Sequence, residues 1–87
     1  MSDVPATGTV PFVGPVKRSI TIAGHATSIS LEPVFWTALE AAASRRGLPL
    51  SALVAEVDAV RTGQADAPNL ASCLRSWLLR EIANHSQ

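Results

Sequence analysis

The side chains best suited to acid–base or nucleophilic catalysis near neutral pH are His25, Cys73 and His85. Acid–base or nucleophilic catalysis needs a second group within hydrogen-bond reach of the first. His25 falls at the tip of a predicted hairpin, Cys73 on the apolar stripe of a predicted helix, and His85 near the last residue. We therefore assign no catalytic residue, no metal ligand and no cofactor, and we expect a protein that is not an enzyme.

Residues 18–33, RSITIAGHATSISLEP, could bind a ligand through hydroxyl groups, because apolar residues alternate there with serine and threonine. A period of two is typical of strands. Gly24 and His25 fit the central positions of a type II′ turn, because glycine adopts the positive φ of the first position. This turn pairs Ile20 with Ile29. Both strands then have their apolar side chains on one face and their hydroxyl groups on the other.

Three helices are predicted after the hairpin. The first starts at Pro33, which suits a first helical position, and stops at Gly47. The second lies within residues 48–63 and is apolar nearly all round. The third lies within residues 69–83, with Asn69 as its N-cap. The fold class is α+β and mostly α, a short β-hairpin followed by three helices.

The chain divides into three parts. Residues 1–16 contain three prolines and two glycines, whose spacing interrupts both helices and paired strands, so we expect a flexible N-terminal arm. Residues 17–83 form one domain that includes the C-terminal helix. Residues 84–87 are expected to be a frayed tail.

Charge and cysteine content narrow the class of protein. Seven basic and seven acidic residues give a net charge of zero, so any attraction to nucleic acid must be local. A single cysteine excludes an intrachain disulfide and favours a reducing compartment. No segment approaches the roughly 20 apolar residues of a membrane span, and the first residues lack a signal peptide. We expect a soluble, cytoplasmic protein without membrane contact.

Burial favours two copies of the chain. A chain of this size buries a smaller fraction of its surface than larger chains do, and a two-stranded hairpin alone is marginally stable in water. The second strand has an open edge, and the second helix has more apolar surface than the first helix can cover. We therefore expect an intertwined homodimer that shares an antiparallel sheet. Its predicted core consists of Ile29, Leu31, Leu50, Leu53, Val54 and Val57.

The order of hairpin, helix with proline near its start, glycine turn and apolar helix resembles the ribbon-helix-helix superfamily of Arc and methionine repressors. The motifs SLEPxFWxAL and SALVAEVD resemble a bacterial subfamily more closely, over about residues 18–82. The resemblance implies that the strand before the first helix enters the major groove of double-stranded DNA and reads bases with Ala26, Ser28 and Ser30. It also implies that the amides around Leu50 and Ser51 hold a phosphate.

The residues around these positions limit what the DNA surface can do. Ala26 offers only a methyl group, which makes none of the bidentate contacts that discriminate bases. Pro49 donates no amide to a phosphate. Lys17 and Arg18 have two interpretations that the sequence leaves open, contact with backbone phosphates or a solvated strand start.

Two functions from different classes follow. The first is a dimeric ribbon-helix-helix protein that binds DNA as a transcriptional regulator, for example a repressor. The alternative is a dimeric protein-interaction scaffold or antitoxin-like module with weakened or lost DNA binding, which offers the helix of residues 69–83 to a protein partner. The DNA target and the protein partner stay open.

Overall fold

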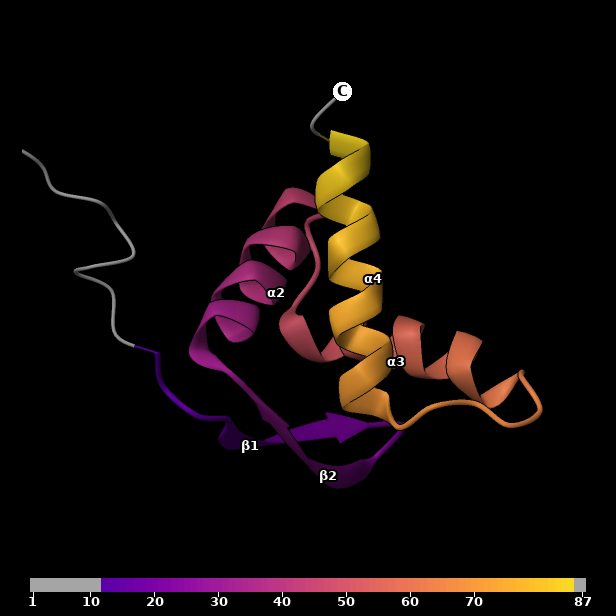
Figure 1. Cartoon of the computed structure of the whole chain (residues 1–87). Coiled ribbons are helices and arrows are strands. Elements are labelled where there is room, and N and C mark those ends of the chain that lie inside the picture. Colours follow the sequence, from indigo (N-terminus) through magenta and orange to yellow (C-terminus); the bar gives the residue numbers. More distant parts are fainter. Residues whose placement is uncertain (1–11, 86–87) are drawn as a thin grey trace, which may run out of the picture.

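The computed structural model describes residues 12–85 and has a two-stranded hairpin with three helices on one side of it (Figure 1). This architecture confirms the predicted fold class. Residues 1–11 of the predicted N-terminal arm lie outside the described residues. The last helix continues two residues beyond the predicted boundary, so residues 84 and 85 are helical rather than frayed. The elements are β1 (Val16–Ile22), β2 (His25–Leu31), α2 (Pro33–Arg45), α3 (Leu50–Thr62) and α4 (Leu70–His85).

The hairpin turn is centred on Ala23 and Gly24, one residue earlier than predicted. The strands pair Ile20 with Thr27, so the predicted pairing of Ile20 with Ile29 is wrong. Ala23 has a φ of 52° and Gly24 a φ of 81°, and two positive φ values are typical of a type I′ turn, not of type II′. The register differs from the prediction by two residues, so each side chain keeps its predicted face.

Helix α2 begins and ends where the sequence predicts. Pro33 is its first residue, and Gly47 follows it with a φ of 68°, a conformation that glycine adopts without a Cβ clash. The Leu48 amide donates to the Ala43 carbonyl at 2.9 Å, and the Gly47 amide donates to the Ser44 carbonyl at 3.0 Å. This pair of hydrogen bonds is a Schellman motif, which turns the chain toward α3.

The start of α4 is also confirmed. The Oδ1 atom of Asn69 accepts a hydrogen bond from the Ser72 amide at 2.9 Å, so Asn69 is the N-cap. None of the helices in residues 12–85 is long and apolar enough to span a membrane.

The core lies between the inner face of the hairpin and the three helices. Five of the six residues predicted for a dimer core are buried within the single chain, and Leu50 is half-buried. Helix α4 packs against α3 and adds Leu74 and Leu78, which are almost fully buried. Helix α4 therefore covers apolar surface of α3 that the sequence analysis assigned to a second copy. The buried apolar residues are Ile20, Ile29, Leu31, Trp36, Leu39, Ala42, Ala43, Leu53, Val54, Val57, Leu74 and Leu78.

Three arginines each combine an aromatic ring with a carboxylate from another element. Their guanidinium carbons lie 4.7, 5.1 and 5.5 Å from the ring centroids. Their ion pairs measure 3.2, 2.8 and 3.0 Å in the same order. Two of the three sets join α2 or its ends to α4, so they fix how these helices lie against each other. The sets are Arg18 with Trp36 and Glu40, Arg46 with Trp77 and Glu81, and Arg75 with Phe35 and Glu32.

Candidate nucleic-acid interface

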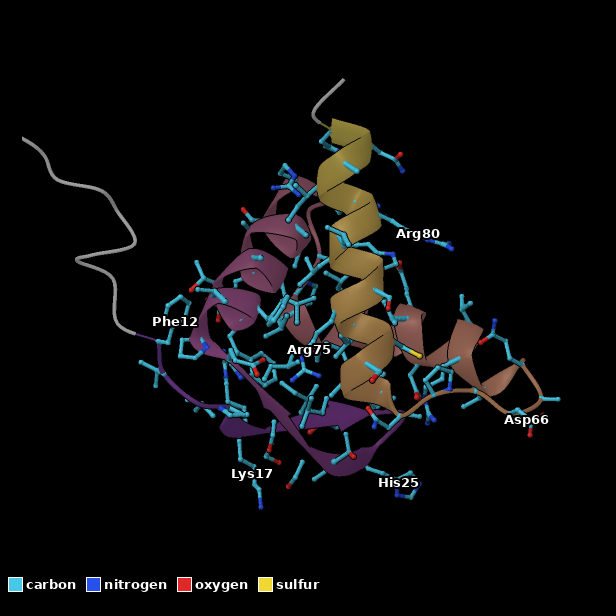
Figure 2. All side chains as sticks on the ribbon, viewed as in Figure 1. Phe12, Lys17, His25, Asp66, Arg75 and Arg80 are labelled. Carbon is cyan, nitrogen blue, oxygen red and sulfur yellow. The ribbon has the colours of Figure 1, made fainter. Side chains whose placement is uncertain are left out.

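The outer face of the hairpin is the side that points away from the helices. It consists of six residues, three alternate residues from each strand. Figure 2 shows the Lys17 side chain pointing away from the helices on this side. All six residues are exposed except Ser30, which is half-buried. The face contains four hydroxyl groups, one cation and no carboxylate. Its cross-strand pairs are Lys17 with Ser30, Ser19 with Ser28, and Thr21 with Ala26.

Burial explains why these residues share a face. Ile20 and Ile29 are 7% and 3% exposed and lie on the opposite, inner face, where they pack under the helices. Because side chains alternate along a strand, their polar neighbours must point outward. The structure thus brings Ala26, Ser28 and Ser30 together with Lys17.

Arg18 is separated from this face. Its Nη2 atom lies 3.2 Å from Oε2 of Glu40, and its guanidinium lies over the Trp36 ring. Alternation places Arg18 on the same side of β1 as Ile20, toward α2. Lys17, in contrast, has no ion-pair partner within residues 12–85. Of these two basic residues, only Lys17 lies on the outer face of the hairpin.

The second predicted phosphate contact, the N-terminus of α3, is not part of the hairpin. Helix α3 has no side-chain cap, because its N-cap residue is Pro49. The Pro49 carbonyl accepts the Ala52 and Leu53 amides at 3.0 and 3.2 Å. The Leu50 and Ser51 amides make no hydrogen bond inside the described part of the chain. Two free donors at a helix N-terminus suit an anion.

Glu32 is the N-cap residue of α2, and its carboxylate pairs with Arg75 of α4. A backbone hydrogen bond at Glu32 itself, followed by the hydrogen bond from Arg75, lowers the pKa of this carboxyl below its ordinary value. Both Nε and Nη2 of Arg75 donate to Oε1 of Glu32, at 3.2 and 3.0 Å. This contact joins the start of α2 to α4, and it occupies the Arg75 guanidinium, which is therefore not a free phosphate ligand.

The residues with catalytic chemistry do not form a site together. The Cys73 thiol donates to the Pro68 carbonyl at 3.7 Å. His85 contacts the Glu81 carbonyl one turn earlier in α4 at 3.1 Å, and His25 is exposed at the start of β2. Within residues 12–85, no three His, Cys, Asp or Glu side chains are placed to hold a metal ion.

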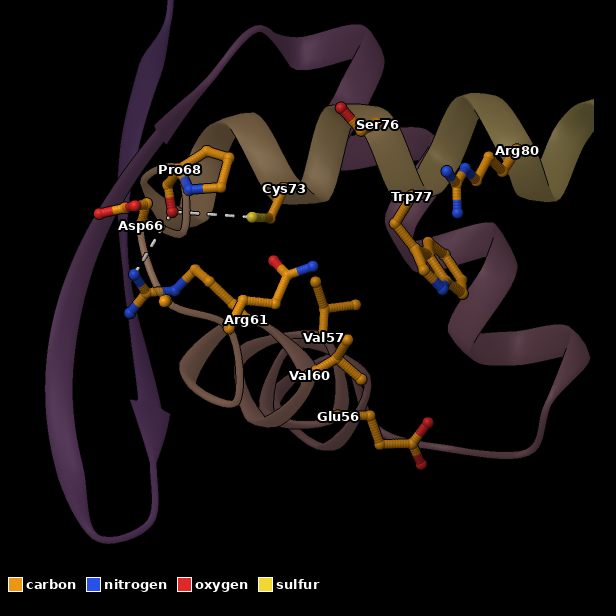
Figure 3. A pocket seen from close by; sticks show the side chains of 12 residues that line it. Glu56, Val57, Val60, Arg61, Asp66, Pro68, Cys73, Ser76, Trp77 and Arg80 are labelled. Carbon is orange, nitrogen blue, oxygen red and sulfur yellow. Dashed lines mark hydrogen bonds between the residues drawn. The ribbon is translucent and has the colours of Figure 1, made fainter.

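The sequence did not predict two hollows on the surface of the helices. One is a cleft of about 630 Å³ between α3, the following loop and α4 (Figure 3). The other is an apolar groove of about 210 Å³ between α2 and α4. Their sequence signals are weak, because exposed apolar residues such as Val34, Val60 and Leu79 look like core residues until the packing of α4 is known. The groove is lined by Val34, Phe35, Ala38, Leu78, Leu79 and Ile82.

A hairpin with a hydroxyl-rich outer face, a helix, a glycine turn and an apolar helix defines a ribbon-helix-helix class of protein. The family model described as "Ribbon-helix-helix domain" matches residues 15–82, and the chain belongs to this family. Proteins with this domain are typically dimeric DNA-binding regulators and antitoxins, and they are generally non-catalytic. No curated protein and no solved structure matches the chain.

Proposed function

We propose that this protein is a dimeric, DNA-binding transcriptional regulator whose hairpin binds in the major groove of double-stranded DNA. The observation that carries the proposal is the outer face of the hairpin, which combines exposed hydroxyl groups and Lys17 and has no carboxylate. Hydroxyl groups donate to and accept from base edges and phosphates alike. An acidic side chain on this face would repel the phosphates, and none is there.

Each strand of the hairpin has its own role in this proposal. In a dimer whose β2 strands pair, β2 lies at the centre of a four-stranded sheet and β1 at each side. With strands about 4.8 Å apart, the sheet is about 14 Å wide, whereas the major groove is about 12 Å wide. The two β2 strands fit the groove, and each β1 strand lies over the sugar–phosphate backbone. Ser28 and Ser30 then reach base edges, and Lys17 reaches a phosphate.

Two further contacts follow from the same placement. The Ala26 methyl group suits a thymine methyl group, which is an apolar contact with modest discrimination. The Leu50 and Ser51 amides at the start of α3 suit a phosphate. Serine hydroxyls accept almost any base edge, so we expect broad rather than stringent sequence preference from this face.

Binding to random-sequence duplex DNA at two salt concentrations tests the proposal. Contacts with phosphates release counterions, so the affinity must fall steeply between about 50 and 200 mM salt. Fluorescence anisotropy of a labelled duplex measures this directly. Salt-sensitive binding near 50 mM supports the proposal, and its absence contradicts it.

The apolar groove between α2 and α4 favours a second candidate, a protein-interaction scaffold or antitoxin-like module. Val34 and Leu79 on its rim are 65% and 71% exposed. Of the two leucines of α4 that line the groove, Leu78 is buried and Leu79 is exposed, so a protein partner can contact α4 through the exposed rim of the groove. A folded dimer without salt-sensitive DNA binding would favour this candidate.

A further inference from the structure

The groove between α2 and α4 is lined by apolar side chains alone. Val34, Leu79 and Ile82 on its rim are 65%, 71% and 49% exposed, whereas Leu78 beneath them is buried. The exposed apolar surface thus comes from both walls, the first turn of α2 and the second half of α4. Apolar side chains gathered around one hollow suit burial against a partner.

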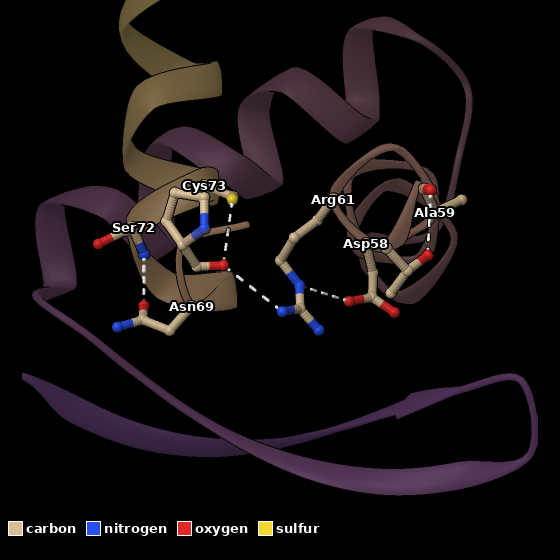
Figure 4. Close-up of polar contacts among 8 residues, drawn as sticks. Asp58, Ala59, Arg61, Asn69, Ser72 and Cys73 are labelled. Carbon is tan, nitrogen blue, oxygen red and sulfur yellow. Dashed lines mark hydrogen bonds and ion pairs between the residues drawn. The ribbon is translucent and has the colours of Figure 1, made fainter. Parts of the chain in front are cut away.

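The larger cleft between α3 and α4 is a different kind of surface. Charged side chains such as Asp66 and Arg80 line it together with apolar ones. Its Arg61 is fixed from two sides, since it donates to Asp58 at 3.0 Å and to the Pro68 carbonyl at 3.4 Å (Figure 4). An apolar ligand there would remove water from these polar groups at a cost, so the α2–α4 groove is the better site for one.

The length of the groove face follows from helical spacing. The face that begins with Val34 and Ala38 continues through Ala41 to Arg45, because residues three and four apart share one side of a helix. The rise from Val34 to Arg45 is about 16 Å, or about three turns. Both walls are helices, whose backbone groups are already paired, so they offer no ladder to an extended peptide. A helix, which pairs its own backbone groups, suits such a groove.

The charges along this groove are balanced except at one end. Glu32 is paired with Arg75 at 3.0 Å, and Glu81 is paired with Arg46 at 2.8 Å. Arg45, in contrast, is exposed and has no ion pair within residues 12–85. The groove face therefore ends in an uncompensated positive charge, which an acidic side chain complements.

We propose that the α2–α4 groove binds an amphipathic helix of another protein, with an apolar stripe against Val34 and Leu79 and an acidic side chain beside Arg45. The inference rests on the second candidate of the proposed function and names the chemistry of its partner. Because the groove lies on the helices and the proposed DNA surface is the outer face of the hairpin, the two ligands occupy different surfaces. The contact area is small, and small interfaces are typical of transient encounters.

Synthetic helical peptides test the inference by fluorescence anisotropy. Each is alanine-based, about 14 residues long, and has leucines four and three residues apart on one face. Two peptides carry a glutamate beyond the leucines at opposite ends, because a helix can lie in a groove in either direction, and two matched peptides carry lysine there. We expect one glutamate peptide to bind with a Kd of about 10–100 μM, and its lysine counterpart about threefold more weakly.

Three variants of the full chain locate the binding site. Leu79→Lys should weaken binding at least about tenfold, because it removes an apolar contact from the rim. Ala83→Lys is the matched control and should change the Kd by less than about twofold, since it adds the same charge at an exposed position of α4 that does not line the groove. Arg45→Glu should reverse the preference, so that the lysine peptide binds about threefold more tightly than the glutamate peptide. Circular dichroism checks the fold of each variant.

The inference is overturned if neither glutamate peptide binds below about 1 mM, if Leu79→Lys binds like the wild type, or if Arg45→Glu still prefers glutamate. A change in the self-association of the peptide-free chain caused by Leu79→Lys, measured by sedimentation, would overturn it by assigning the groove to a second copy. Tighter peptide binding by Phe12→Ser would overturn it by assigning the groove to the N-terminal segment of the same chain. None of these readouts contains DNA, so a failure of DNA binding is seen separately.

Discussion

The ion pair between Arg46 and Glu81 gives the most demanding test of how α4 is held. Nη2 of Arg46 donates to both carboxylate oxygens of Glu81, at 2.8 and 3.0 Å. The Glu81 side chain is 10% exposed and the Arg46 side chain 41% exposed. Replacing Arg46 by methionine keeps an unbranched apolar chain over Trp77 and leaves the buried carboxylate without its guanidinium.

The expected loss follows from that burial. Breaking a buried pair by removing one partner costs about 3–5 kcal/mol. Water reaches the half-exposed Arg46, so we expect a smaller loss of about 2–3 kcal/mol in the free energy of unfolding. Adding Glu81→Gln should recover most of this loss, because a neutral amide then replaces the buried carboxylate that lost its guanidinium.

Arg18→Met is the matched comparison, since Arg18 also lies over a tryptophan and pairs with a glutamate. Its partner Glu40 is 55% exposed, so we expect that variant to lose only about 1 kcal/mol. Urea unfolding at one fixed protein concentration, followed by circular dichroism, measures all variants. Equal losses for Arg46→Met and Arg18→Met would refute the reasoning.

Three further predictions follow from single positions. Lys17→Ala should lower the affinity for all DNA sequences alike. In the anisotropy assay it should reduce the slope of log affinity against log salt concentration by about one per protomer. An unchanged slope would show that Lys17 does not contact a phosphate. Ala23→Asn should raise the free energy of unfolding by about 0.5–1 kcal/mol, because Asn-Gly is preferred in a type I′ turn; a loss in urea unfolding would contradict that turn type. Glu32 has a lower pKa in the folded chain than in the unfolded chain, so the unfolded chain takes up the proton first as the pH falls. Its stabilisation is therefore complete above the ordinary pKa of 4.5 and is lost as the pH falls through the folded pKa. Thermal melts of wild type and Glu32→Gln should converge in that acidic range, and parallel curves would refute the effect.

Local signals predicted the helix ends well. Pro33, Gly47 and Asn69 act through their own backbone or through a residue three positions away, so the sequence contains the whole cause. The hairpin turn was misplaced by one residue because Gly24 fits a central position of either turn type. Both registers keep the same faces, so the hydrophobic pattern could not decide between them.

Long-range contacts could not be read from the sequence. Alternation along the strand places Arg18 on the face of Ile20, but nothing near Arg18 in the sequence indicates that its partners there are Glu40, 22 residues away, and the Trp36 ring. An apolar stripe on the last helix shows that this stripe is buried, but it does not show which chain covers it. The structure packs α4 on its own chain, and this packing creates the α3–α4 cleft.

One measurement tests most directly whether the outer face of the hairpin binds DNA. Ser28→Asp adds a carboxylate at the centre of that face, and Thr37→Asp adds the same charge on an exposed position of α2. At about 50 mM salt, we expect Ser28→Asp to weaken duplex binding at least tenfold and Thr37→Asp to change it by less than about threefold. Equal affinities of these two variants for DNA would contradict the assignment of the hairpin as the DNA interface.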